Sequence, residues 1–134
     1  KIAKNHGLIF LENLKTKNMS KSASGSLELP GKMVAAKSGL NRAILRQGWH
    51  SFQVKLEHKA QEFGCFVEYL NPKNTSRECS SCSHTAKENR KSQEVFECIS
   101  CGYTENADIN ASKNIEARGL RVFALKTEDY ALVG

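Results

Sequence analysis

The sequence predicts an α/β domain that is interrupted by a small metal-binding insert. Two short apolar runs typical of strands lie on either side of a long segment with helical periodicity, and a second helical segment follows later. Between the second strand and that last helix lies a polar stretch, residues 71–105, which holds four of the five cysteines. The predicted order is therefore strand, helix, strand, insert, helix.

Bulk composition is that of a folded soluble protein. The chain has 134 residues, of which 40% are hydrophobic and 25% are charged, so global disorder is not expected. No apolar run approaches the ~20 residues of a membrane helix, and no signal peptide is evident, which predicts a cytoplasmic protein without a membrane partner. The first residue is Lys1 rather than Met, and we therefore expect a fragment or a processed chain.

The first strand is predicted at Leu8–Leu11, a continuous apolar run of the kind that is buried on both faces in a parallel or mixed sheet. Glu12 follows it directly. Residues 15–32 are rich in Ser, Gly and Lys and are expected to form a loop.

The long helix is predicted from about Lys37 by an apolar stripe with spacings of three and four residues. The stripe consists of Leu45, Trp49, Phe52, Leu56, Ala60 and Phe63. Gly64 stands where a helix C-cap glycine belongs. The second strand is expected at Cys65–Leu70, and Asn71 and Pro72 would end it.

The insert carries two Cys-x2-Cys pairs, Cys79 with Cys82 and Cys98 with Cys101, with fifteen residues between them. Such pairs aim four thiolates at one tetrahedral zinc ion, whose binding can fold an insert that has no core. Disulfides are not expected without secretion, a redox pair explains only two cysteines, and an iron–sulfur cluster is a weaker alternative. His84 could in principle replace a thiolate. Cys65 has no partner, so core packing is expected for it.

The last helix is predicted from Ala107 to about Arg118, with Gly119 as its stop signal. Asp108 stands at its start. Taken singly, Glu12 could be a solvated strand end and Asp108 could stabilise the helix N-terminus. Carboxylates at a strand end and a later helix start can also converge at one sheet edge, as in two-metal nucleases.

Positive charge is concentrated in the first half of the chain. Residues 1–65 carry eleven Lys or Arg against four Glu, a net +7, whereas residues 66–134 carry nine against ten, a net −1. This excess is typical of a protein that binds nucleic acid, and a well-solvated surface is the equal alternative. The candidates for contacts with a nucleic-acid backbone are Lys15, Lys17, Lys21, Arg42 and Arg46.

Three stretches of the sequence resemble the OrfB/TnpB proteins of insertion sequences. Thr75 to Gly119, TSRECSSCSHTAKENRKSQEVFECISCGYTENADINASKNIEARG, is similar to their C-terminal part, and ADINASKNI directly after a four-cysteine ribbon is its most specific motif. LIFLENLKTKNM resembles the family's second nuclease motif, and SGLNRAILRQGWHSFQVKLEHKAQEFG resembles its connecting helix. The resemblance covers nearly the whole chain.

The resemblance implies a partial RNase H-like, or RuvC-like, nuclease core with a zinc ribbon inserted before its last catalytic helix. Residues 1–70 would hold the second motif and connecting helix, residues 71–105 the zinc ribbon, and residues 106–134 the third motif and tail. Glu12 and Asp108 match the second and third catalytic positions, which would bind Mg²⁺ or Mn²⁺. DNA would be the substrate and guide RNA a partner of the full-length protein, in the cytoplasm of a bacterium or archaeon.

One departure from the family pattern concerns the first catalytic aspartate, which belongs on an earlier strand. No Asp precedes Asp108 here. We therefore expect this chain alone to be inactive, and its first strand to expose an edge that invites oligomerisation or the missing N-terminal half. The alternatives are a non-catalytic nucleic-acid-binding zinc-ribbon module from a truncated or decayed element, and a purely structural or protein-binding ribbon.

Overall fold

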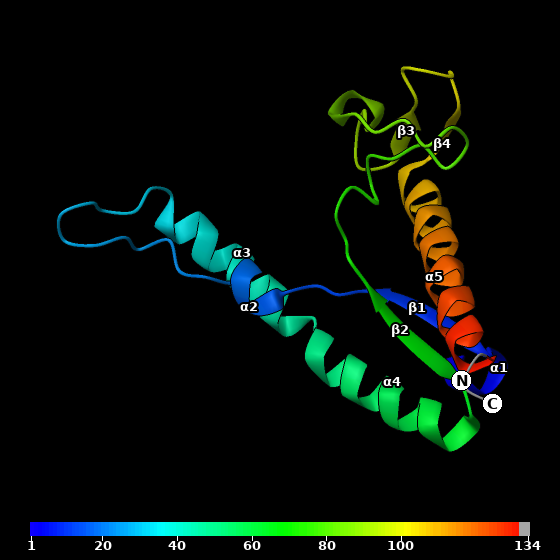
Figure 1. The fold of residues 1–134 in the computed structure, drawn as a ribbon. Helices are drawn as coiled ribbons and strands as arrows, with labels where there is room; N and C mark the ends of the chain where they lie inside the picture. The colour runs from blue at the N-terminus through cyan, green and yellow to red at the C-terminus, as the bar shows by residue number, and fades with distance from the viewer. Residues whose placement is uncertain (132–134) are drawn as a thin grey trace. The chain divides into compact units, whose positions relative to one another are not determined.

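The structure, a computed structural model, describes residues 1–131 (Figure 1). Its backbone contacts divide the chain into two compact units. The first unit contains residues 1–8 and 14–66, and the second contains residues 9–13 and those from 67 onward. The predicted division at residues 70 and 105 stays a prediction, and residues 132–134 of its last segment lie outside the described part.

The first unit is helical and has a small core. Its helices are α1 (Ile2–Asn5), α2 (Thr16–Met19), α3 (Val34–Arg46) and α4 (Trp49–Phe63). Helix α1 packs against α4, and α2 packs against α3. Ala3 on α1 and Leu56 and Ala60 on α4 are buried, so the core of this unit lies along the contact between those two helices. The short helix α2 lies inside the stretch predicted as a loop.

The prediction of a single long helix from the apolar stripe is wrong, because the structure has two helices there, α3 and α4. Gln47 and Gly48 interrupt it, and Gly48 has a left-handed backbone with φ of 60°. A glycine in that conformation ends a helix at little cost, whatever the periodicity of the side chains around it. Leu45 consequently stands on a different helix from the rest of the stripe and is 66% exposed. The helix end at Gly64 is confirmed, with φ of 66° and a Cys65 N to Ala60 O hydrogen bond.

Both predicted strands are confirmed and pair with each other as β1 (Leu8–Glu12) and β2 (Phe66–Leu70). The backbone hydrogen bonds join Phe66 N to Gly7 O and Asn13 N to Leu70 O, which makes the pair parallel. Burial on both faces is not borne out, since every residue of β1 is partly exposed. The sheet has only these two strands among residues 1–131, too few neighbours to enclose β1.

Helix α5 (Ala107–Ala131) continues through Gly119, so the predicted stop at that glycine is wrong. A Cβ atom at Gly119 would lie 2.2 Å from Cγ of Phe10 on β1. No real side chain tolerates that separation, so the glycine permits a close approach between helix and strand rather than an end. The buried Gly119 therefore fixes how α5 rests on the strand that ends at Glu12.

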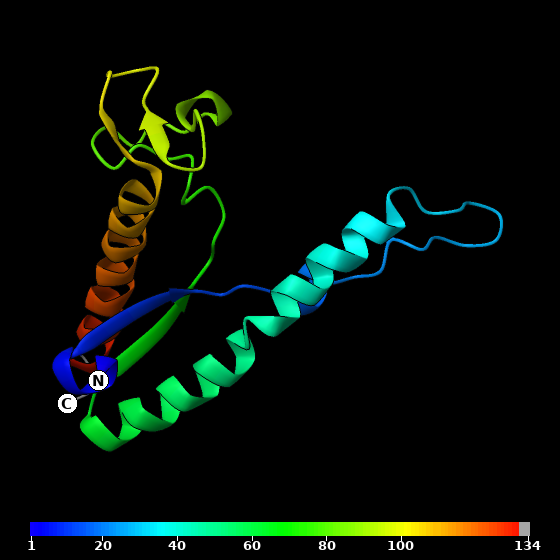
Figure 2. The same ribbon diagram turned by 180° about the vertical axis from the view of Figure 1, so that it is seen from behind.

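Residues 71–106 fold at the amino-terminal end of α5, as both views show (Figures 1 and 2). Strands β3 (Val95–Glu97) and β4 (Thr104–Asn106) form an antiparallel hairpin in which Phe96 faces Glu105 in register. A short 3₁₀ helix, η1 (Lys87–Asn89), precedes it. Phe96 is fully buried and packs with Cys79, Cys98 and Ala107. We call residues 71–106 the ribbon. Among the described residues, no helix has the length and apolarity needed to cross a membrane.

Candidate functional site

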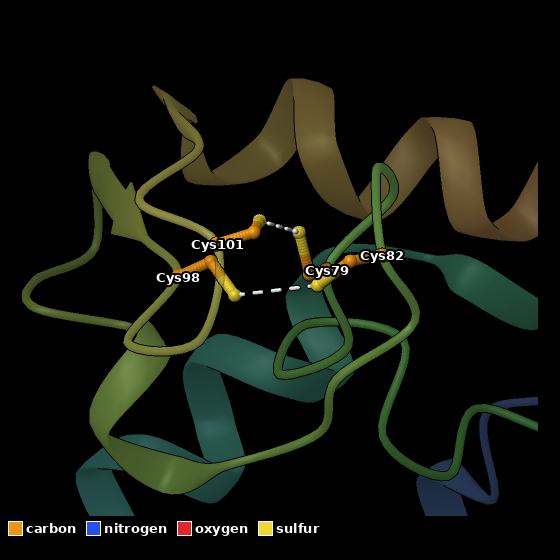
Figure 3. Close-up of side chains that lie close together, drawn as sticks. All are labelled: Cys79, Cys82, Cys98 and Cys101. Carbon is orange, nitrogen blue, oxygen red and sulfur yellow. Dashed lines mark hydrogen bonds between the residues drawn. The ribbon is translucent and has the colours of Figure 1, made fainter.

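The four cysteines of the ribbon converge on one point (Figure 3). Their Sγ atoms all lie within 4.8 Å of one another, with 3.7 Å between Cys79 and Cys101 and 3.6 Å between Cys82 and Cys98. Four sulfurs placed ~2.3 Å from a central ion at tetrahedral corners would be about 3.8 Å apart. The cluster is therefore positioned to bind a metal ion, as the Cys-x2-Cys spacing predicts.

Each cysteine pair sits on the same kind of backbone turn, which we call a knuckle. In the first, Cys79 N donates to His84 O at 3.0 Å and Ser83 N donates to Cys79 O at 2.8 Å. In the second, Cys98 N donates to Tyr103 O at 2.8 Å and Gly102 N donates to Cys98 O at 2.9 Å. The two turns thus repeat one hydrogen-bonding pattern nineteen residues apart, and each aims two sulfurs at the centre.

The thiols differ in their readiness to ionise. At Cys98, burial opposes ionisation, but hydrogen bonds from backbone groups and neighbouring thiols together lower its pKa to about 6. At Cys82, a hydrogen bond with the backbone of His84 favours the thiolate. Hydrogen bonds with the neighbouring thiols, that of Cys101 first, oppose it and raise the pKa of Cys82 to about 12. Burial raises the pKa of Cys79. Four bunched thiols cannot all be charged at neutral pH unless a cation neutralises them, which is what a coordinated metal does.

Two buried asparagines hold the knuckles, and sequence reasoning did not find either. Asn89 accepts from Ile99 N at 3.0 Å and donates to Arg77 O and His84 O, so it joins the second knuckle to the first. Asn110 accepts from Ser80 N at 3.0 Å and donates to Glu78 O, so it joins the first knuckle to α5. Both side chains are 0% exposed. Buried amides with all these partners specify one arrangement of the backbone.

Helix α5 is hydrogen-bonded to the segment before the first knuckle through polar side chains that are spaced four residues apart. Asn110 is followed by Asn114, which donates to Thr75 O at 2.9 Å and Glu78 O at 2.7 Å. Arg118 then donates to Lys73 O and forms an ion pair with Glu78. The i, i+4, i+8 spacing in the sequence was the available signal, because it places all three on one helix face.

The first predicted carboxylate, Glu12, is the last residue of β1 and is half-buried. Thr75, which is 3% exposed, donates its hydroxyl to Glu12 Oε1 at 2.5 Å. Thr75 was not singled out from the sequence, since a threonine in a polar insert carries no signal of its own.

The second predicted carboxylate, Asp108, stands in the first turn of α5 and its side chain is 86% exposed. Capping of the helix is not its task, because Asn106 Oδ1 accepts from the N–H groups of Asp108 and Ile109. The carboxylate lies 3.6 Å from Nη2 of Arg90 in the ribbon.

Glu12 and Asp108 line the same open hollow, although 96 residues separate them in the sequence. The hollow has a volume of about 320 Å³, and all of its walls belong to the second unit. Pro72, Thr75, Ser76, Arg90, Ala111, Ser112 and Ile115 complete its lining. Strand β1, the ribbon and α5 therefore each bring a charged side chain to one place.

The other residues predicted from the sequence lie outside both the hollow and the cysteine cluster. The five basic candidates, Lys15, Lys17, Lys21, Arg42 and Arg46, are all exposed and belong to the first unit. Nucleic-acid binding by them stays a prediction. His84 contributes its backbone carbonyl to the first knuckle and is not part of the sulfur cluster. Cys65 is buried and lies outside the cluster, in keeping with core packing.

Comparison with known proteins gives a consistent result. Residues 49–115, half of the chain, match the family model described as Cas12f1-like, TNB domain. The chain is 51% identical over 123 residues to "Putative RNA-guided DNA endonuclease InsQ" of Escherichia coli (strain K12), covering 92% of this chain and 31% of that protein. It is 42% identical over 71 residues to "CRISPR-associated endodeoxyribonuclease Cas12f1" of Sulfoacidibacillus thermotolerans, covering 52% of this chain and 17% of that protein.

A solved structure also resembles the chain. In the cryo-EM structure of a Cas12f1–sgRNA–target DNA complex, the matching protein has a TM-score of 0.53 and 26% sequence identity, covering 85% of this chain and 28% of that one. The mixed helix and strand fold is thus that of a segment of such proteins. This chain spans less than a third of the length of each of these three relatives.

Proposed function

We propose a function on the premise that this chain belongs to the Cas12f1-like TNB domain family and so to the OrfB/TnpB proteins. The chain is the C-terminal part of a transposon-encoded, RuvC-like DNA endonuclease that depends on divalent metal ions and is guided by RNA in its full-length form. The core surrounding Glu12 and Asp108 is RNase H-like in this proposal.

Zinc is the metal we propose for the cysteine cluster. Four sulfur donors at near-tetrahedral separations suit Zn²⁺, whose structural sites take four protein ligands and no substrate. The site therefore stabilises the ribbon and takes no part in chemistry. Its function is to keep Arg90 and the start of α5 in place beside the hollow.

Magnesium or manganese is the metal we propose for the hollow. Carboxylate oxygens at the end of β1 and the start of α5 are hard donors of the kind these ions prefer. Glu12 and Asp108 would hold the ion, which would supply an activated water and stabilisation of the leaving oxygen in phosphodiester hydrolysis. Arg90 keeps a positive charge beside Asp108 and can donate to a phosphate oxygen of the DNA strand.

The observation that carries this proposal is the shared hollow. Either carboxylate alone has an ordinary explanation, but two carboxylates that are 96 residues apart in the sequence and line one open hollow do not. The capping interpretation of Asp108 is weakened further because Asn106 already caps the helix.

The test is binding of Mn²⁺ to the zinc-loaded chain, followed by electron paramagnetic resonance. We expect Glu12→Gln and Asp108→Asn each to weaken Mn²⁺ binding at least tenfold, because each removes one charged ligand. Glu116→Gln is the matched control, since Glu116 is an exposed acid on the same helix that does not line the hollow. Equal Mn²⁺ affinity in all four proteins would contradict the proposal.

A second candidate function is non-catalytic binding of nucleic acid, favoured by the exposure of all five basic candidates in the first unit. Because the chain alone is expected to be inactive, cleavage of labelled single-stranded DNA with Mn²⁺ separates the two functions in the full-length protein. The nuclease proposal predicts that any cleavage is lost in Asp108→Asn while DNA binding persists. Joint replacement of Arg42 and Arg46 by Gln should instead weaken binding, most clearly at low salt.

A further inference from the structure

One buried threonine links the two carboxylates of the hollow through the fold. Thr75 donates to Glu12 Oε1 at 2.5 Å, and its own carbonyl accepts from Asn114 Nδ2 at 2.9 Å. Asn114 stands on α5, six residues after Asp108. A continuous run of contacts therefore leads from the helix that carries Asp108 to the side chain of Glu12.

Thr75 is well fixed for such a task. The residue is 3% exposed and Asn114 is 6% exposed, so solvent does not compete for either hydrogen bond. Asn114 uses its second amide hydrogen on Glu78 O at 2.7 Å, which anchors the same stretch of backbone a second time. A hydroxyl held by rigid backbone can fix the rotation of the carboxylate to which it donates, leaving Oε2 for a cation.

The competing role for the hydroxyl is closure of a local turn. Thr75 Oγ1 also lies 3.1 Å from Pro72 O, and a hydroxyl has only one proton to donate. The separation from Glu12 is shorter, and a bond to a carboxylate is stronger than one to a neutral carbonyl. The Thr75 hydroxyl therefore donates its hydrogen bond to Glu12 Oε1 rather than to Pro72 O.

We propose that Thr75 is a positioning residue for the metal ligand Glu12, and that Asn114 makes α5 set the orientation of both carboxylates together. The inference rests on the proposed metal-dependent function of the hollow. Groups that orient a ligating carboxylate usually matter to metal affinity by 10–100-fold, although they never touch the ion.

The first experiment needs no metal in the hollow. Thermal unfolding of the zinc-loaded chain is measured for Thr75→Val in the native background and again with Glu12→Ala. We expect Thr75→Val to lower Tm by roughly 5 °C in the native background, and by less than half as much once Glu12 is gone. An equal loss in both backgrounds would mean that the hydroxyl only closes the turn at Pro72, and would overturn the inference.

The second experiment measures Mn²⁺ affinity by electron paramagnetic resonance. Thr75→Val should weaken binding roughly tenfold and Thr75→Ser should restore it to within about threefold, because Ser keeps the hydroxyl. Thr85→Val is the control, since Thr85 is an exposed threonine of the ribbon outside the hollow.

The two proposals fail in different ways. If Glu12→Gln weakens Mn²⁺ binding but Thr75→Val does not, the positioning role is wrong and the metal site stands. If Glu12→Gln has no effect on Mn²⁺ binding, the proposed function fails, and the thermal experiment alone decides whether Thr75 fixes Glu12.

Discussion

The two knuckles of the ribbon share one backbone design but are supported differently. In both, the residue after the first cysteine donates its N–H to the side-chain oxygen of a buried asparagine, Asn110 for Ser80 and Asn89 for Ile99. Asn110 belongs to α5, whereas Asn89 belongs to the ribbon itself. The first knuckle is thus tied to the helix that carries Asp108, and the second is tied to the first.

This difference separates the two tasks of the ribbon. The hydrogen bonds of Asn89 hold the two halves of the cysteine cluster together. Those of Asn110 fix the first knuckle to α5, the helix that carries Asp108 to the hollow. A defect in the first set should affect metal binding, and a defect in the second should affect Asp108 more than the metal. The knuckles are therefore alike in geometry and unlike in consequence.

The largest effect is expected from removing a sulfur. Cys82→Ser and Cys98→Ser should each abolish stoichiometric zinc binding and unfold the ribbon, because a structural zinc of this type contributes about 10–16 kcal/mol to folding. Zinc content by mass spectrometry and circular dichroism check both results. The equivalence of the knuckles would be broken if Cys82→Ser kept its zinc and lost it only with His84→Ala, since only the first knuckle has a nearby histidine.

Removing the supporting amides should distinguish the knuckles. Asn89→Ala removes three hydrogen bonds and leaves Ile99 N without a partner, while His84 O keeps its bond from Cys79 N and Arg77 O keeps its bond from Ala86 N, for an expected cost of about 2–4 kcal/mol. Asn110→Ala should cost about 1–3 kcal/mol, because Glu78 O keeps its bond from Asn114.

Urea denaturation of the zinc-loaded proteins measures both costs, with Asn5→Ala, an exposed asparagine, as the control. Only Asn89→Ala should also speed the release of zinc to a chelator. Equal costs and equal release rates would refute the division of tasks between the two asparagines.

A smaller effect concerns the residue that closes each knuckle. Ser83 and Gly102 both have a left-handed backbone, with φ of 62° and 73°. That conformation costs a residue with a side chain about 1 kcal/mol, and a Cβ at Gly102 would meet no atom within 4 Å, so strain is the only penalty there. Ser83→Gly should stabilise the ribbon by about 0.5–1 kcal/mol and Gly102→Ser should destabilise it by a similar amount, as urea denaturation would show. Changes of the same sign would contradict this account.

The sequence predicted the knuckles because their geometry is local. Two residues between cysteines and a fixed turn suffice to aim the sulfurs, so spacing alone placed Cys79, Cys82, Cys98 and Cys101 in one cluster. The strands and the starting point of α5 followed equally from local patterns. Placement of Glu12 and Asp108 in one hollow was reached through the order of elements and the family resemblance, since neither residue is unusual where it stands.

What local patterns missed was decided across the fold. A helix ends at Gly48, whereas α5 continues through Gly119. The difference is the ring of Phe10, which lies so close to position 119 that only a glycine fits there. Asn89, Asn110 and Thr75 are polar residues in polar surroundings, so nothing in the sequence marks them as buried. Their roles depend on hydrogen-bond partners up to 63 residues away, which no pattern of spacing encodes.

The smallest effect is expected at the second tie between a knuckle and α5. Tyr103, whose carbonyl accepts from Cys98 N in the second knuckle, donates its hydroxyl to Glu105 Oε2 at 2.6 Å, and Lys113 of α5 donates to the same carboxylate at 2.7 Å. The hydrogen bond from Lys113, and after it the one from Tyr103, lowers the pKa of Glu105. The contacts of Glu105 therefore stabilise the fold fully above the ordinary pKa of a glutamate. This stability is lost as the pH falls through the lowered pKa of Glu105. Lys113 is 47% exposed, so Lys113→Met should change Tm only slightly near pH 7 and not at all at high salt or below that pKa. A Tm loss as large as that of Asn110→Ala, or one that persists in acid, would mean that the second knuckle is bound to α5 as firmly as the first.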